Sequence, residues 1–465
     1  MGAPVNKGAL LARHALLPGG WALDVAIEWN ADGVITAVNP NAGAVAGIDT
    51  ETLVIPGIVN LHSHAFQRAM AGLAETAGDS AAYTDDSFWT WRELMYRFAG
   101  RITPEQLEAV AAQLFVDCLR HGFTSVCEFH YLHRQPDGAL YARPAEMAER
   151  VAQAAVDTGM GLTMLPVLYS HGGFGEQPLS ERQRRFKSDV DQVLGIVDAL
   201  SARRGGQFET GAAPHSLRAA SMAQIAELAR GLPAGRPLHM HIAEQQLEVD
   251  ACLAHAGRRP VAWLLDNIDI DRRWCLVHAT HLDDAEIGSL AASGAVAGLC
   301  PGTEANLGDG LFALAPFIAA GGRFGIGSDS HVGHSPVEEL RWLEYGQRLR
   351  RQGRNIAVDG GQRRVGDFLW QGALRGGAQA SGRPVGALAV GLRADLLVLD
   401  DAHPNLQDAA AADVLNLLLF AGNDNLVRDV IVGGRPVIRH GRHADQAAIA
   451  ARYRGALAQL RENAP

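Results

Sequence analysis

One repeated pattern limits the fold more than any other feature of this chain. From residue 56 to residue 351, short apolar runs typical of buried strands alternate with longer amphipathic runs typical of helices. Thr103–Gln106 is a capping box with proline at the first helical position, and the helix that it opens ends at Gly122. We predict eight strands, the first beginning at Ile58 and the others at 124–129, 162–168, 208–213, 238–242, 275–278, 295–299 and 324–327.

Eight strand–helix units favour an α/β fold, a (β/α)8 TIM-type barrel over residues 56–385. An open doubly wound sheet usually carries a Gly-x-Gly-x-x-Gly turn after its first strand, and the sequence has none there. The 465 residues are 48% hydrophobic, which is enough to bury a core of that size.

The two ends of the chain have a different texture. Residues 9–55 hold short β-type runs separated by turn signals, and similar runs return at 394–399 and 427–438. We therefore expect residues 1–55 and 386–465 to fold together into a small β-sandwich domain, with a helix at the C-terminus.

Composition excludes several classes of protein. The formal net charge of −10, without a patch rich in lysine and arginine, argues against a nucleic-acid partner. The sequence has neither a signal peptide nor a run near the ~20 apolar residues of a membrane span, so we expect no membrane partner and a cytoplasmic location. The five cysteines are far apart and form no Cys-x-x-Cys pair, which indicates neither disulfides nor a thiolate zinc site.

Polar residues gather at the predicted ends of the strands. His62 and His64 lie two residues apart at the end of a strand, so their side chains project to the same face. Taken singly, such residues are buried histidines satisfied by the core, helix-capping aspartates or solvated glutamates. In a barrel, however, functional residues occupy the C-terminal ends of strands. Their coincidence there predicts a metal site that draws on the following residues: His62, His64, His239 or His241, Glu244, His278 and Asp329.

These residues, in this order, resemble the amidohydrolase superfamily over nearly the whole chain. The resemblance implies four metal ligands: His62, His64, His241 and Asp329. The family motif His-x-Ala-Glu selects His241 as the ligand, so we expect His239 to be packed or to support the ligands. Members with two metals use a lysine on the fourth strand, which this sequence lacks. The resemblance therefore implies one divalent ion per subunit, as in the deaminase branch.

The residue types also predict a reaction. A divalent ion with three imidazoles and a carboxylate lowers the pKa of water toward ~7 and so supplies hydroxide. We expect Asp329 and His278 to take the proton from that water and orient it, and Glu244 to protonate the leaving nitrogen. Hydrolysis of an acyl amide is possible with the same residues, but the arrangement of Glu244 resembles that of aminohydrolases that attack C=N bonds.

Arg92 and Arg218, in the predicted loops, favour an anionic substrate, because a guanidinium binds a carboxylate through two parallel hydrogen bonds. The segments 60–67, 213–218, 239–245 and 300–310 are similar to the formimidoylglutamate deiminase family of bacterial histidine degradation. The resemblance implies hydrolysis of a small dicarboxylate amidine, N-formimino-L-glutamate, to N-formyl-L-glutamate and ammonia by a zinc-dependent homodimer. It implies that five residues hold the substrate carboxylates: Gln67, Arg92, Tyr131, His215 and Arg218.

Several alternatives stay open from the sequence. A purine, pyrimidine or triazine aminohydrolase would share every residue of the metal site, and a non-catalytic scaffold would share the fold. Iron or manganese would also accept these ligands. The sequence does not say which residue binds which carboxylate, or whether the glycine-rich loop 170–178 is a lid or a flexible connection.

Overall fold

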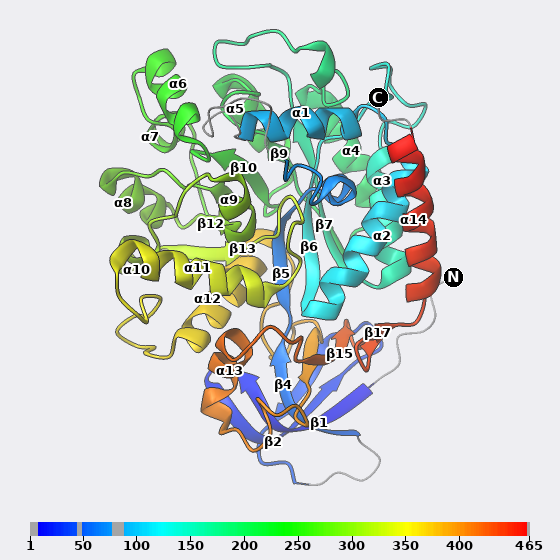
Figure 1. Cartoon of the computed structure of the whole chain (residues 1–465), viewed down its shortest axis with the longest axis vertical. Coiled ribbons are helices and arrows are strands. Elements are labelled where there is room, and N and C mark those ends of the chain that lie inside the picture. Colours follow the sequence, from blue (N-terminus) through cyan, green and yellow to red (C-terminus); the bar gives the residue numbers. More distant parts are fainter. Residues whose placement is uncertain (1–7, 44–48, 77–87, 463–465) are drawn as a thin grey trace.

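The computed structural model describes residues 8–43, 49–76 and 88–462. Figure 1 shows a central group of strands with helices around it and a second sheet at one end of the molecule. The described α/β content and the sheet made from both ends of the chain agree with the sequence analysis.

The central strands form two parallel sheets. In the first sheet β5 (Ile58–Ser63), β6 (Phe123–His130), β7 (Gly161–Leu168) and β8 (Phe208–Thr210) are neighbours in that order, and β9 (Ala213–Pro214) also pairs with β7. The second sheet has the order β10 (Leu238–Ile242), β11 (Trp274–His278), β12 (Val296–Leu299) and β13 (Arg323–Ile326). The eight predicted strands are therefore present, with 208–213 broken into two pieces.

Single bridges join the two sheets at both of their junctions. A parallel bridge between Ala212 and Leu238 links the end of the first sheet to the start of the second. Another parallel bridge, between Ser63 and Asp329, links β5 to the segment that follows β13. All the strands are parallel, so their C-terminal ends meet at one edge, where the predicted site residues stand.

Helices follow most of the strands, and the predicted ones are confirmed to within a few residues. They are α2 (Pro104–His121), α3 (Glu146–Thr158), α4 (Val190–Ser201), α5 (Met222–Gly231), α8 (Asp284–Ser293), α10 (Leu314–Ala319) and α11 (Pro336–Arg351). The capping box at Thr103 forms, and Gly122 ends the helix at a φ of 105°. That left-handed conformation favours glycine because it has no Cβ.

Other helices were not predicted. They are α1 (Phe88–Ala99), α6 (Gln246–Ala256), α7 (Pro260–Asn267), α9 (Pro301–Leu307), α12 (Val365–Ser381) and α13 (Val414–Phe420). In α6, Leu247 and Leu253 are exposed whereas Val249 and Cys252 are buried, so its apolar residues do not mark one face. Hydrophobic periodicity could not reveal such a helix.

The two ends of the chain fold together, as expected. The N-terminal strands are β1 (Gly8–Leu17), β2 (Gly20–Trp29), β3 (Ile35–Asn39) and β4 (Asp49–Pro56), and the C-terminal strands are β14 (Leu396–Leu399), β15 (Val427–Val432), β16 (Arg435–Arg439) and β17 (Arg442–His443). Antiparallel pairing of β4 with β14 joins them into one sheet of eight strands, in the order β17-β16-β15-β14-β4-β1-β2-β3. Hydrogen bonding therefore makes one continuous sheet here, where a sandwich suggests two.

The expected C-terminal helix is α14 (Gln446–Glu462), and it lies beside α2 (Figure 1). Gln106 Nε2 on α2 donates to Gln459 Oε1 on α14 over 2.9 Å. All five cysteines are buried and unpaired, which agrees with the absence of a disulfide framework. None of the helices in the described ranges is long and apolar enough to cross a membrane.

Candidate metal centre and active site

His62 and His64 point to the same place, as their spacing predicts. Their Nε2 atoms lie 3.1 Å apart at the end of β5. Both side chains are buried, and the Nδ1–H of His64 donates to the carbonyl of Phe129 over 2.9 Å. This hydrogen bond leaves the Nε2 lone pair of His64 facing the centre of the site.

His241 and Asp329 complete the predicted set of ligands. His241 Nε2 lies 2.9 Å from His62 Nε2. Asp329 Oδ1 lies 3.4 Å from His62 Nε2 and 3.3 Å from His64 Nε2. The structure therefore brings together three imidazoles and one carboxylate from β5, β10 and the end of β13. Two overlapping groups have the spacing of metal ligands. One is formed by His62, His64 and Asp329, and the other by His62, His241 and His278.

The electrostatics of these side chains suit a divalent cation. Burial lowers the pKa of His62 to about 3 and also lowers the pKa of His64 and of His241, so these rings are neutral. Burial acts against ionisation of Asp329, but the hydrogen bond with His62 and the attraction to His62, His64 and His278 together outweigh it and hold the pKa of Asp329 well below its usual range. Neutral nitrogens about 3 Å apart cannot all hydrogen-bond to one another, whereas ligands about 2.0–2.1 Å from one ion would have that spacing.

His239 lies outside this group, although it precedes His241 by only two residues. Its Nε2 is 2.8 Å from the carbonyl oxygen of Ala380, and the side chain is fully buried. It is packed in the core, as we expected.

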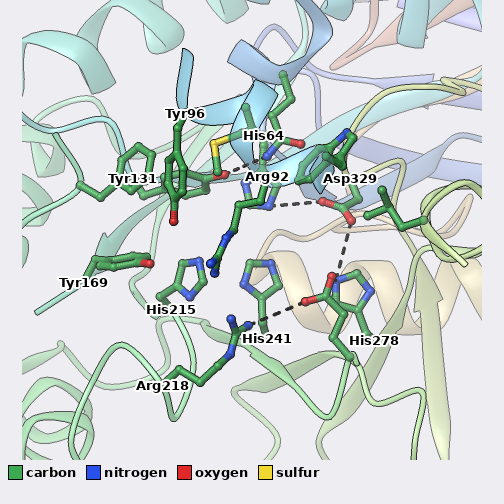
Figure 2. Close-up of a pocket in the computed structure, with 16 residues that line it drawn as sticks. His64, Arg92, Tyr96, Tyr131, Tyr169, His215, Arg218, His241, His278 and Asp329 are labelled. Atoms are coloured by element: carbon green, nitrogen blue, oxygen red, sulfur yellow. Dashed lines mark hydrogen bonds and ion pairs between the residues drawn. The ribbon is translucent and has the colours of Figure 1, made fainter. Parts of the chain in front are cut away.

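Glu244 and His278 face the same centre from β10 and β11. His278 Nε2 lies 3.7 Å from Glu244 Oε1 and 3.7 Å from Asp329 Oδ2 (Figure 2). Burial raises the pKa of Glu244 to about 7. Burial opposes protonation of His278, but Glu244 and neighbouring carboxylates outweigh it and raise its pKa to about 10. His278 is thus a proton donor at neutral pH, which suits an orienting role better than the proton-accepting one.

Glu304 is a neighbour of this site that the sequence analysis did not single out. Its Oε1 lies 3.3 Å from His278 Nδ1 and accepts a hydrogen bond from the backbone N–H of Cys300. Glu304 lies in the segment 300–310, which resembles the formimidoylglutamate deiminase family, but that resemblance assigned no role to any single residue of the segment. The one signal in the sequence was an acidic residue within that segment.

All five predicted substrate-binding residues line the pocket that His64, His241 and Asp329 also line. Gln67 Nε2 donates to the hydroxyl of Tyr131 over 2.8 Å, and the ring of His215 lies 4.9 Å from the ring of His241. In Figure 2, Arg92 and Arg218 enter the pocket from opposite sides. Further lining residues were not anticipated: Trp91, Met95, Tyr96, Tyr169, Phe186 and Leu307.

Arg218 also contacts two carboxylates. Its Nη2 lies 3.9 Å from Glu244 Oε2 and 3.9 Å from Glu248 Oε2. The guanidinium therefore borders the pocket and the proposed proton donor at once.

The loop 170–178 lies next to this pocket. Residues His171, Gly173, Gly175 and Glu176 line a neighbouring hollow that also includes Arg218. Phe174 stacks on His255, with ring centroids 5.8 Å apart.

Comparison with known proteins identifies the family. Residues 53–437 match the family described as "Amidohydrolase family". This chain belongs to the amidohydrolase family. Residues 8–50 of this amidohydrolase match a second family, described as "Formimidoylglutamate deiminase HutF, N-terminal domain".

Relatives of this amidohydrolase extend over its whole length. It is 54% identical over 453 residues to formimidoylglutamate deiminase of Pseudomonas aeruginosa, covering 97% of this chain and 99% of the relative. It is 27% identical over 422 residues to 5-methylthioadenosine/S-adenosylhomocysteine deaminase of Natronomonas pharaonis, covering 90% and 89%. The crystal structure of an amidohydrolase from Brucella melitensis is 47% identical, with a TM-score of 0.92 and coverage of 97% and 99%.

Proposed function

We propose that this amidohydrolase hydrolyses the formimino C=N bond of N-formimino-L-glutamate, as in histidine degradation. The observation that carries the proposal is the full-length identity of 54% to a formimidoylglutamate deiminase. The two arginines in the pocket of the candidate metal site agree with a substrate that has two carboxylates.

We propose that His62, His64, His241 and Asp329 hold one divalent ion, and that the ion is zinc. Three nitrogen ligands and one oxygen ligand are typical of zinc in proteins, and the neutral rings and ionised carboxylate fit it. When bound, such an ion lowers the pKa of water from about 15.7 toward about 7, which makes the nucleophile available at neutral pH.

The residues around the ion account for the remaining steps. Asp329 is placed to accept the proton of the attacking water, and His278 orients that water through its Nε2–H. The water oxygen bonds to the formimino carbon, and the bond from that carbon to its terminal nitrogen then breaks. The terminal nitrogen needs two protons to leave as ammonia. One comes from Glu244, whose pKa burial raises to about 7, and the other is the proton that Asp329 accepted from the water. The hydroxyl proton of the intermediate then returns to Glu244 as the C=O bond forms. The organic product is N-formyl-L-glutamate.

We propose that the substrate carboxylates bind to Arg92 and Arg218, with Gln67, Tyr131 and His215 completing their surroundings. Arg218 is charged and largely buried, so a carboxylate beside it would interact more strongly than at the surface. The hydrogen bond between Gln67 and Tyr131 fixes both groups in the lining of the same pocket.

At the level of the fold, we propose that the parallel strands close into a (β/α)8 barrel over residues 56–385. The bridges at Ser63–Asp329 and Ala212–Leu238 support closure. We also propose that residues 1–55 and 386–465 form a separate domain whose single sheet folds over as a sandwich. Buried Ile27 on β2 and Ile431 on β15 share one core, although three strands separate β2 from β15 in the sheet. The homodimer implied by the resemblance and the cytoplasmic location expected from the sequence remain proposals.

A second candidate function is deamination of a heterocyclic base. The aromatic side chains Trp91, Tyr96 and Phe186 in the lining favour it, because bases stack on aromatic rings. The relative at 27% identity also carries the name of a nucleoside deaminase.

Release of ammonia by the zinc-loaded protein distinguishes these functions. The substrates compared are N-formimino-L-glutamate, other formimino amino acids, adenosine and 5-methylthioadenosine. We expect the highest kcat/KM for N-formimino-L-glutamate. A higher value for a nucleoside would favour the second function, and a protein that releases ammonia from none of them would favour the non-catalytic scaffold.

A further inference from the structure

We propose that five buried polar side chains behind the candidate metal ligands His62, His64 and Asp329 form one hydrogen-bonded chain that positions these three ligands for cation binding. The five residues, called the seam network below, are Asn60, Ser63, Glu128, Ser328 and His331. This inference rests on the metal site proposed above and assigns a role to residues outside it.

The seam network lies where the first and last parallel strands meet. The backbone N–H of Asp329 donates to the carbonyl of His62 over 3.0 Å, and the N–H of His64 donates to the carbonyl of Asp329 over 3.2 Å. Asp329 has a φ of 49°, in the left-handed region that residues other than glycine rarely adopt. A residue in that conformation persists only where its surroundings hold it. We therefore expect side chains, in addition to these two backbone hydrogen bonds, to hold Asp329 in this conformation.

One half of the network holds the segment that carries Asp329. Asn60 Nδ2 donates to Ser328 Oγ over 2.7 Å, and the backbone N–H of Ser328 donates back to Asn60 Oδ1 over 3.0 Å. Ser328 Oγ then lies 2.9 Å from His331 Nδ1. Both sides of Asp329 are thus attached to β5 through side chains.

The other half holds the segment between the two histidine ligands. Ser63 stands between His62 and His64, and its Oγ lies 3.2 Å from His331 Nε2. The Ser63 hydroxyl donates to Glu128 Oε2 on β6 over 2.5 Å. Glu128 Oε1 accepts the backbone N–H of Ala65 over 2.7 Å. Glu128 thus fixes the chain immediately before and after His64.

One assignment of protons satisfies every group in the network. Since Ser63 donates to Glu128, its oxygen accepts from His331 Nε2–H. His331 Nδ1 is then the acceptor, Ser328 O–H donates to it, and Ser328 Oγ accepts from Asn60. Each of the five residues is at most 2% exposed, so water does not compete for these bonds. A buried network whose members are all matched is rigid, and breaking one bond leaves costly unpaired groups.

The rigidity acts on the ligands because network residues are their neighbours in the chain. Ser63 adjoins His62 and His64, and Ser328 adjoins Asp329. The network therefore places ligands from both ends of the central strands at fixed separations before a cation arrives. Groups that support metal ligands in this way typically contribute 10–100-fold to metal affinity.

Zinc affinity, measured by competition with a chromophoric chelator on the full-length metal-free protein, tests the proposal. The variants are Ser63→Ala, Ser328→Ala and the double variant. Thr163→Val is the matched control, because Thr163 is fully buried and donates one hydrogen bond, to the carbonyl of Ser381, away from the network. Thermal unfolding of each metal-free protein measures the general cost of losing a buried hydroxyl.

We expect each single network variant to bind zinc about 10–100-fold more weakly than wild type. Thr163→Val should bind zinc as tightly as wild type does. Its melting temperature without metal should nevertheless fall by about as much as that of the single network variants. The double variant should lose less than the product of the two single losses, because both substitutions break the same chain. Wild-type affinity in both single variants, or losses that multiply fully, would overturn the network. A wild-type protein that binds no zinc would overturn the metal site as well.

Discussion

Arg218 Nη2 and Glu244 Oε2 lie 3.9 Å apart, so the proposed anchor of the substrate contacts the proposed proton donor. Glu248 Oε2 lies at the same distance from the same nitrogen. Arg218 lowers the pKa of Glu244 while burial raises it. Substrate binding and proton transfer are thus linked through one side chain, which leads to separate predictions for the two residues.

Replacement of Arg218 removes the charged anchor. We expect Arg218→Met to lower kcat/KM for N-formimino-L-glutamate by roughly 10²-fold or more, as a charged group would then lie unpaired in the pocket. Steady-state ammonia release measures the change. Arg230→Met is the control, because Arg230 is exposed on α5, where its Nε donates to the carbonyl of Ala226, and it does not line the pocket. Unchanged kinetics in Arg218→Met would favour the heterocycle function.

Replacement of Glu244 removes the proposed proton donor but no proposed metal ligand. We expect Glu244→Gln to lower kcat by about 10²–10⁴-fold, the range for loss of general acid–base catalysis. Zinc content, measured by atomic absorption, should equal that of wild type. Glu227→Gln, an exposed glutamate on α5, is the control. Loss of zinc together with activity would show that Glu244 has a different role.

The pH dependence of activity follows from the same carboxyl. Glu244 donates a proton only while protonated, and burial raises its pKa to about 7, so kcat/KM should fall as the pH rises above about 7. Because Arg218 lowers that pKa, Arg218→Met should move the falling limb to higher pH. Profiles of kcat/KM between pH 5 and 9 test both statements. A limb that stays in place in Arg218→Met would contradict the link between the two residues.

Removal of the metal should abolish activity and lower stability. Dialysis against a chelator is expected to stop ammonia release, and zinc at 100 times its Kd should restore it and stabilise the folded protein by about 2.7 kcal/mol. Differential scanning calorimetry with and without zinc measures this shift.

A pair of histidines on one strand provides the control for that shift. His241 Nε2 faces His62, whereas His239 Nε2 faces the carbonyl of Ala380. His241→Gln should therefore lose the zinc-dependent rise in melting temperature, and His239→Gln should keep it. The reverse result would show that the family motif had selected the wrong histidine.

Sequence patterns of short range predicted much of this molecule. Alternating apolar runs and the capping box at Thr103 depend on a few neighbouring residues, and the strands and α2 form where these patterns place them. The shared direction of His62 and His64 also needs only the two-residue period of a strand. Such features are local, so the residues that determine them are adjacent in the chain.

What the tertiary structure decided depends on contacts between distant segments. The pairing of β4 with β14, the approach of Glu304 to His278 and the aromatic lining around Tyr96 join residues that no local period connects. The same holds for Ser63 and His331, which stand 268 residues apart and meet through a single hydrogen bond. The sequence by itself determined the central strands, the predicted helices that follow them and the residue types of the candidate metal site. Their partners, and so the direction of each hydrogen bond, were decided only when parallel strands from both ends of the central segment met.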